Sequence, residues 1–346
     1  MAERTLYLAR HGSHAYGTAR DGSDLDLRGF CVPPRAYLMG FARRFEQAEQ
    51  RGNPDVVVFS LPKFMQLSVE CNPNALEVLF VDPSDRLILT PLGKRILEHR
   101  ESFLSRKARY TFVGYAMSQL KRIETHRRWL LQPPTHQPQR EEFDLPPRTV
   151  IPADQLAAAE SMIRRKVDAW QLDLTGLEEA QKLQLEEHLV GCLSELHAAS
   201  TLERMDAAGR ILGFSENFLR LLDRERRYSQ ALKEWQQYRS WVDTRNPDRA
   251  ALEARYGYDC KHGMHLVRLL RMGREILTEG VMRVRRPDAD ELLAIRDGQW
   301  PFDRLIEWAH REAEALAALA TRSPLPPEPD REALDRLCVE VVEAAL

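Results

Sequence analysis

The spacing of apolar residues changes near residue 106, and this change constrains the fold more than any other feature of the chain. Before it, short apolar runs predict strands at 5–10, 24–32 and 55–61, the last of which is rich in β-branched and aromatic residues. Residues 62–70 instead have apolar positions three to four apart, which is typical of an amphipathic helix, and residues 72–81 predict another short helix with Asn72 as its N-cap. Strand and helix patterns therefore alternate in the first part of the chain, which predicts a small α/β domain.

After residue 106 the spacing predicts helices alone, interrupted by a proline-rich polar segment at 133–152 that we interpret as a loop. The predicted helices cover 107–131, 154–165, 175–199, 202–213, 216–238, 249–255, 259–279, 302–320 and 330–346. We therefore expect an α+β protein with two domains, an α/β domain at residues 1–105 and a mostly helical domain at residues 106–346.

Two carboxylates one residue apart stand out in the second predicted strand. Asp24 and Asp26 point to the same face of a strand, where like charges repel unless a cation lies between them. Such oxygen ligands suit Mg²⁺, which also binds phosphate oxygens and water. A pair of ions needs a third carboxylate, and Asp55 at the start of the next predicted strand is the best placed. Glu70 and Glu77 are weaker candidates because they lie on predicted helices.

Gly12 and Ser13 follow the first predicted strand and supply the other half of a nucleotide site. Glycine permits a tight turn and close backbone approach, and free N–H groups at a following helix start bind phosphate oxygens. We expect Gly12 and Ser13 to hold the β- and γ-phosphates of a nucleoside triphosphate. Asp-x-Asp alone is commonly a solvated turn, and Gly-Ser alone indicates nothing. Their order along the chain, strand by strand, indicates metal-nucleotide binding.

Three basic or titratable residues share a narrow arc of the helix predicted at 259–279. Lys261, His265 and Arg268 fall together at about 100° per residue, and their charges repel one another unless an anion lies nearby. A triphosphate or an RNA backbone satisfies such a cluster. The alternative is a solvated face with internal acidic partners such as Asp259. We expect the three residues to complete the nucleotide site.

The balance of charges and the cysteines limit partners and compartment. The net charge is −2, so no overall field attracts nucleic acid or anionic lipid. Local basic stretches at 106–129 and 283–287 predict either RNA contact or ordinary solvated surface. The cysteines lie far apart without a Cys-x-x-Cys pair, which is typical of reduced thiols in a cytoplasmic protein. We expect no signal peptide and no membrane span, which needs about 20 apolar residues.

Taken together, the segments GSHAYGTARDGSDLDLRGF, DVVVFSLPKFMQL, NPNALEVLF and GYDCKHGMHLVRLLRMGREIL resemble one branch of a known superfamily. Gly12-Ser13, Asp24-x-Asp26 and Asp55 are similar to the signature of the DNA polymerase β-like nucleotidyltransferases. The wider segments resemble the branch of RNA-repair-pathway nucleotidyltransferases. The resemblance implies an N-terminal nucleotidyltransferase domain with a small mixed sheet, followed by a helical domain that completes the nucleotide and acceptor cleft.

The resemblance also implies transfer of a nucleoside monophosphate from an NTP to an acceptor hydroxyl, with RNA (a tRNA or another RNA end) as the expected acceptor. In this hypothesis Asp24, Asp26 and Asp55 hold two Mg²⁺ or Mn²⁺ ions, and the hydroxyl attacks the α-phosphorus in line as pyrophosphate leaves. Two alternatives remain open, a nucleotidyltransferase that modifies a small molecule or a protein, and a nucleotide-binding regulator without turnover. Basic helices favour RNA, near-neutral charge favours the small molecule, and three carboxylates argue against the regulator.

Overall fold

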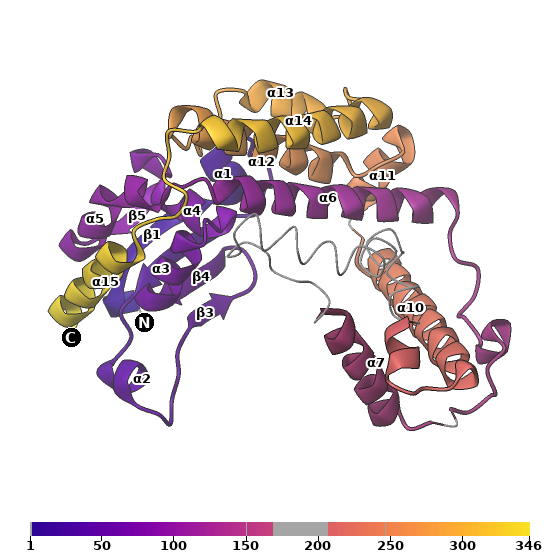
Figure 1. Cartoon of the computed structure of the whole chain (residues 1–346). Helices are drawn as coiled ribbons and strands as arrows, with labels where there is room; N and C mark the ends of the chain where they lie inside the picture. The colour runs from indigo at the N-terminus through magenta and orange to yellow at the C-terminus, as the bar shows by residue number, and fades with distance from the viewer. Residues whose placement is uncertain (1, 150, 169–206, 246) are drawn as a thin grey trace, which may run out of the picture. The chain divides into compact units, whose positions relative to one another are not determined.

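The computed structural model describes residues 2–149, 151–168, 207–245 and 247–346 (Figure 1). The helix predicted at 175–199 and the start of the one predicted at 202–213 lie outside the described residues.

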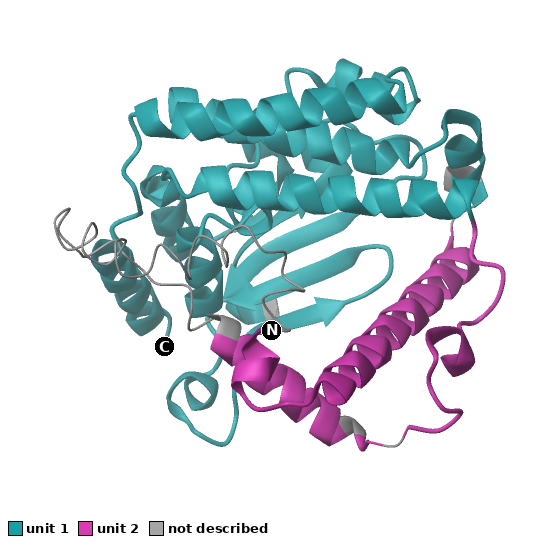
Figure 2. Cartoon of the chain, turned by 45° about the vertical axis from the view of Figure 1, so that its right-hand side comes forward, with its two compact units in different colours: residues 1–132, 246–346 teal, residues 133–245 magenta. Residues whose placement is uncertain are grey.

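The chain forms two compact units, one of residues 1–132 with 246–346 and one of residues 133–245 (Figure 2). The first unit thus joins two segments that are far apart in the sequence. Everything that bears on the predicted site lies in this first unit.

A five-stranded mixed sheet forms the N-terminal part of the first unit. Its strands are β1 (Thr5–His11), β2 (Asp26–Cys31), β3 (Gln47–Gln50), β4 (Asp55–Ser60) and β5 (Arg86–Leu89), in the order β3-β4-β2-β1-β5. β2 and β4 run parallel, and every other neighbouring pair is antiparallel. The mixed sheet and the predicted α+β class are therefore confirmed.

The register of the sheet brings polar residues together at one end of the strands. Asp26 pairs with Asp55 on β4 and with His11 on β1, so the three side chains share a face. The strand begins at Asp26 rather than at Asp24. Asp24 belongs to the preceding loop, which Leu25 ties to the sheet by accepting a 2.9 Å hydrogen bond from the Asp55 N–H.

Two short helices with strong N-terminal signals pack against the sheet. α3 (Leu61–Val69) and α4 (Pro73–Leu79) each carry proline in the first turn, where its missing N–H is harmless. The Ser60 and Asn72 side chains accept backbone hydrogen bonds as N-caps, and the cap predicted at Asn72 is confirmed. The buried apolar face of α3 contributes Phe64, which packs on the strand residue Phe30.

Long helices complete the first unit. α6 (Ala108–Leu131), α12 (Cys260–Glu279) and α14 (Phe302–Arg322) lie side by side as one layer (Figure 1), and α13 (Ala289–Arg296) packs on α12. Because α6 packs in this unit, the border between the units does not coincide with the domain boundary that we place at residue 105.

The remaining elements are mostly short, and the sequence pattern did not predict α1, α2 or α13. The first unit also contains η1 (Ala2–Arg4), α1 (Gly12–Tyr16), α2 (Arg35–Met39), η2 (Pro83–Asp85), α5 (Pro91–Glu98), η3 (Arg100–Phe103), α11 (Pro247–Tyr256) and α15 (Arg331–Ala345). The second unit contains η4 (Arg140–Phe143), α7 (Ala153–Asp168) and α10 (Glu216–Thr244). None of the helices in the described ranges is long and apolar enough to cross a membrane.

Candidate active site

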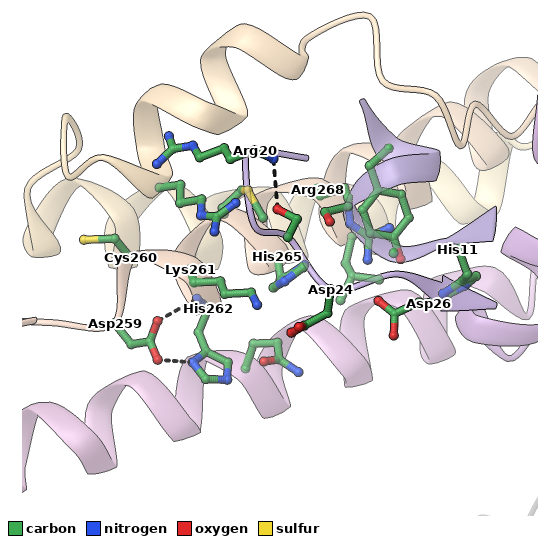
Figure 3. A pocket seen from close by; sticks show the side chains of 18 of the residues that line it. His11, Arg20, Asp24, Asp26, Asp259, Cys260, Lys261, His262, His265 and Arg268 are labelled. Carbon is green, nitrogen blue, oxygen red and sulfur yellow. Dashed lines mark hydrogen bonds and ion pairs between the residues drawn. The ribbon is translucent and has the colours of Figure 1, made fainter. Parts of the chain in front are cut away.

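A cavity of about 720 Å³ lies in the first unit between the sheet end, α4, α6 and α12 (Figure 3). It brings together the two sequence regions in which we predicted nucleotide-binding residues. The predicted residues that line it are Gly12, Ser13, Asp24, Asp26, Lys261, His265 and Arg268. Asp55 stands in register with Asp26 but is not part of the cavity lining.

The three predicted carboxylates differ in their surroundings. Asp24 is exposed on its loop, whereas the side chains of Asp26 and Asp55 are 31% and 37% exposed. One guanidinium, that of Arg28, lies 3.7 Å from Asp26 Oδ1 and 3.2 Å from Asp55 Oδ2. The structure thus brings Asp55 close to Asp26 through the shared Arg28 guanidinium, a contact that no local sequence pattern indicates.

Gly12 is required at its position for two reasons. Its φ of +63° lies in the left-handed region, which disfavours residues with a Cβ. A Cβ at this position also comes within 2.4 Å of Asp26 Oδ2. Gly12 therefore leaves space directly beside one of the predicted ligand oxygens.

On α12, Lys261 and His265 point into the same part of the cavity as Asp24 (Figure 3). Burial lowers the pKa of His265 well below its usual range, and the neighbouring Arg268 and Lys261 cations lower it further. His265 is therefore a neutral imidazole at pH 7, able to donate or accept a hydrogen bond but not to act as a cation.

Arg268 turns toward the sheet and joins a buried polar cluster. It is 4% exposed, donates to Glu77 of α4, and lies over the Tyr16 ring with Cζ 3.8 Å from the centroid. The Tyr16 hydroxyl donates to Glu77 Oε2 at 2.5 Å, and His11 Nε2 lies 3.1 Å from the same oxygen. Arg268 therefore links α12 to α1 and α4.

The charges in this buried cluster stabilise one another. Burial alone raises the pKa of Glu77, but the Arg268 guanidinium, the neighbouring His11 imidazole and a hydrogen bond from Tyr16 outweigh it and lower the pKa to about 2. Glu77, a weaker candidate metal ligand from the sequence, is fully buried, and its oxygens already contact Arg268, Tyr16 and His11. The position of Glu77 on a mostly apolar helix gave no signal in the sequence that it would be the centre of a buried polar cluster.

A second polar cluster lines the cavity at the start of α12. Asp259 accepts from His262 Nδ1 at 2.5 Å and caps the helix by accepting from the His262 N–H. Ligand atoms of His126, Asp259 and His262 lie within 4.8 Å of one another, a spacing that suits a metal ion. Arg122 Nη1, however, is 3.3 Å from His262 Nε2, and this cation disfavours a second one there.

Several cavity residues were not singled out by the sequence. These are Tyr16, Arg20, Arg28, Asn74, Gln119 and Arg296. Arg20 illustrates why, because it is an ordinary loop arginine that the fold pairs with Asp297 at 2.6 Å, on a segment far along the chain. Asp259 and His262, by contrast, did give a local signal, because an acidic residue lies three residues before a histidine at a helix start.

The two basic stretches differ in how far carboxylates within the protein neutralise them. In the stretch 283–287 each arginine pairs with a carboxylate, such as Arg285 with Asp85 at 2.8 Å and Arg286 with Glu275 at 2.7 Å. In the stretch 106–129, Lys107 pairs with Glu70 at 2.8 Å. These contacts favour the surface interpretation for 283–287, whereas RNA contact by α6 stays a prediction.

Comparison with known proteins identifies the N-terminal part of the chain. Residues 2–135 match the RNA repair pathway DNA polymerase beta family. The predicted family is confirmed over this segment, which carries the sheet and the carboxylates. The match ends within the segment that follows α6, so α12 and its residues lie beyond it.

One relative is a phage protein. The chain is 28% identical over 127 residues, 34% of its own length, to an uncharacterised 38.9 kDa protein of the nrdC-mobD intergenic region of Enterobacteria phage T4. The match spans 38% of the length of that relative. No solved structure matches the chain.

Proposed function

We propose that this protein is a metal-dependent nucleotidyltransferase that moves a nucleoside monophosphate from an NTP to a hydroxyl group of RNA. The observation that carries the proposal is the parallel register of β2 and β4, which pairs Asp26 with Asp55 beside a cavity that Asp24 also lines. The family description supports nucleotide transfer and RNA as the acceptor class.

The residues at the strand ends fit a divalent cation. Carboxylates are the hard oxygen donors that Mg²⁺ and Mn²⁺ prefer, and Asp24 and Asp26 both reach the cavity. The missing side chain of Gly12 keeps the space beside Asp26 Oδ2 clear. When bound, such an ion polarises the phosphate and stabilises the charge that develops during transfer.

The chain's own groups then bind and orient the substrates. In this proposal Gly12 and Ser13 hold the β- and γ-phosphates, and Lys261 and His265 contact the nucleotide from α12. The acceptor oxygen forms a bond to the α-phosphorus as the bond to the bridging oxygen breaks. The hydroxyl proton leaves to solvent, and pyrophosphate departs toward Lys261. Arg268 acts through Glu77, holding α12 against the sheet.

Incubation with each labelled NTP and Mg²⁺, with and without total RNA, tests the proposal. Label on RNA with the wild-type protein and none with Asp24→Asn supports it, while Glu49→Gln, an exposed acid on β3, serves as the matched control. If the label appears on a small metabolite or on protein instead, that molecule and not RNA is the acceptor. Nucleotide that is bound but never converted contradicts catalysis.

A further inference from the structure

Arg28 lies between two of the carboxylates that the proposed function assigns to metal binding. Its Nη2 is 3.7 Å from Asp26 Oδ1 and 3.2 Å from Asp55 Oδ2. Its Nη1 donates to the backbone carbonyls of Leu27, at 3.0 Å, and of Asp55, at 3.2 Å. The two carbonyls anchor the side chain so that its other nitrogen faces both acids.

Strand geometry explains why this arginine reaches both acids. Arg28 follows Asp26 by two residues, so the two side chains share one face of β2, and the parallel register sets Asp55 beside Asp26 on that face. Arg28 is 21% exposed, so its attraction to the carboxylates is only partly screened by water. A single positive charge is thus built into the place where a cation between Asp26 and Asp55 would bind.

The carboxylates therefore offer two unequal places for a cation. Asp24 and Asp26 both line the cavity, whereas Asp55 faces Arg28 and is not part of the lining. A divalent ion held by Asp26 and Asp55 together meets the repulsion of Arg28 Nη2 or must displace it. An ion held by Asp24 and Asp26 on the cavity side keeps Arg28 in its position.

We propose that Arg28 fills a cation position between Asp26 and Asp55, so that the protein without nucleotide binds one divalent ion instead of two. This inference rests on the proposed function, since it assumes that the carboxylates bind metal. Arg28 acts as a positioning residue that holds Asp55 and limits the number of ions.

Mn²⁺ binding to the full-length protein tests the inference, measured by equilibrium dialysis and metal analysis without nucleotide. We expect one ion on the wild type and two on Arg28→Met. Loss of the repulsion makes binding between Asp26 and Asp55 about 10-fold tighter than in the wild type, so that the second ion is detected. Arg28→Lys keeps the charge, so we expect one ion. Arg10→Met is the matched control because Arg10 pairs with Leu27 and lies on the opposite face of the sheet.

Thermal unfolding shows whether each variant is folded. Arg28→Gln is the second neutral variant, used in case Arg28→Met does not fold. The inference is overturned by two ions on the wild type, or by one ion with unchanged affinity on both neutral variants. In either case the proposed function stands if nucleotide is still transferred. If no variant binds Mn²⁺ and the wild type transfers no nucleotide, the proposed function fails and the inference with it.

Discussion

Two carboxylate clusters of the first unit use the same chemistry in opposite settings. At the strand ends, Asp26 and Asp55 are about one third exposed and share the guanidinium of Arg28 at 3.2–3.7 Å. Behind them Glu77 is fully buried, and Arg268, Tyr16 and His11 surround its oxygens. One cluster is open to a ligand from the cavity, which Asp26 lines, and the other is a fixed joint that holds α12 in place.

Solvent access explains the difference. A partly exposed ion pair adds little to stability, since water competes for both partners. A buried ion pair is different, because removing one partner leaves the other charged and desolvated. Charge alone therefore does not identify a ligand site, and exposure has to be known as well.

Replacing Asp26 by Asn tests the exposed cluster most directly. The amide keeps the size of the side chain but removes the charge that the proposed metal site needs, so nucleotide transfer falls by about 10³-fold or more. The melting temperature stays within about 2 °C of the wild type because the side chain is partly exposed. Transfer assays with labelled NTP and calorimetry measure the two effects. Full activity in Asp26→Asn contradicts the site.

Replacing Glu77 by Gln tests the buried cluster. It leaves the Arg268 guanidinium buried without a carboxylate, so we expect the free energy of unfolding to fall by about 3–5 kcal/mol. Urea denaturation followed by circular dichroism measures this. The matched control is the double variant Glu77→Leu with Arg268→Met, which we expect to be more stable than Glu77→Gln. A single variant as stable as the wild type removes the contrast between the clusters.

The pH dependence of stability sharpens the same contrast. The pKa of Glu77 is lowered from its usual 4.5 to about 2 in the folded protein. The folded state thus binds fewer protons than the unfolded state, and the stability from Glu77 is complete above pH 4.5 and lost as pH falls toward 2. We expect the unfolding free energy of the wild type to fall more steeply across this window than that of the double variant. Equal slopes contradict the prediction.

Replacing Gly12 by Ala tests the close approach at the exposed cluster. The left-handed backbone costs about 1–2 kcal/mol for a residue with a Cβ, and the Cβ also meets Asp26 Oδ2. Gly22→Ala is the matched control, since Gly22 has a φ of +77° with no atom within 4 Å of a Cβ. We expect similar losses of stability but about 10-fold weaker Mn²⁺ binding in Gly12→Ala alone. Equal Mn²⁺ affinities would show that the contact is irrelevant.

The strands and helices near the site were predictable because their signals are local. Short apolar runs predicted β1, β2 and β4, with β-branched residues clearest in β4, and the Asn72-Pro73 start predicted α4. The elements α1, α2 and β3 were missed because each is short. β3 also carries charged and polar residues, and it forms a strand only because it pairs with β4. In the site, Gly12 and the Asp-x-Asp gave signals, whereas Arg28 did not, because its role depends on the register of a neighbouring strand.

Local patterns were enough to predict the α+β class, the order of the motifs and the candidate ligands, because spacing along one strand or helix fixes which side chains share a face. Which charges remain available depends instead on contacts between distant segments. Arg268 looked like a phosphate ligand beside Lys261, yet the fold buries it against Glu77. Burial and pairing between distant segments set the free energy of each charge, and neither can be read from neighbours along the chain.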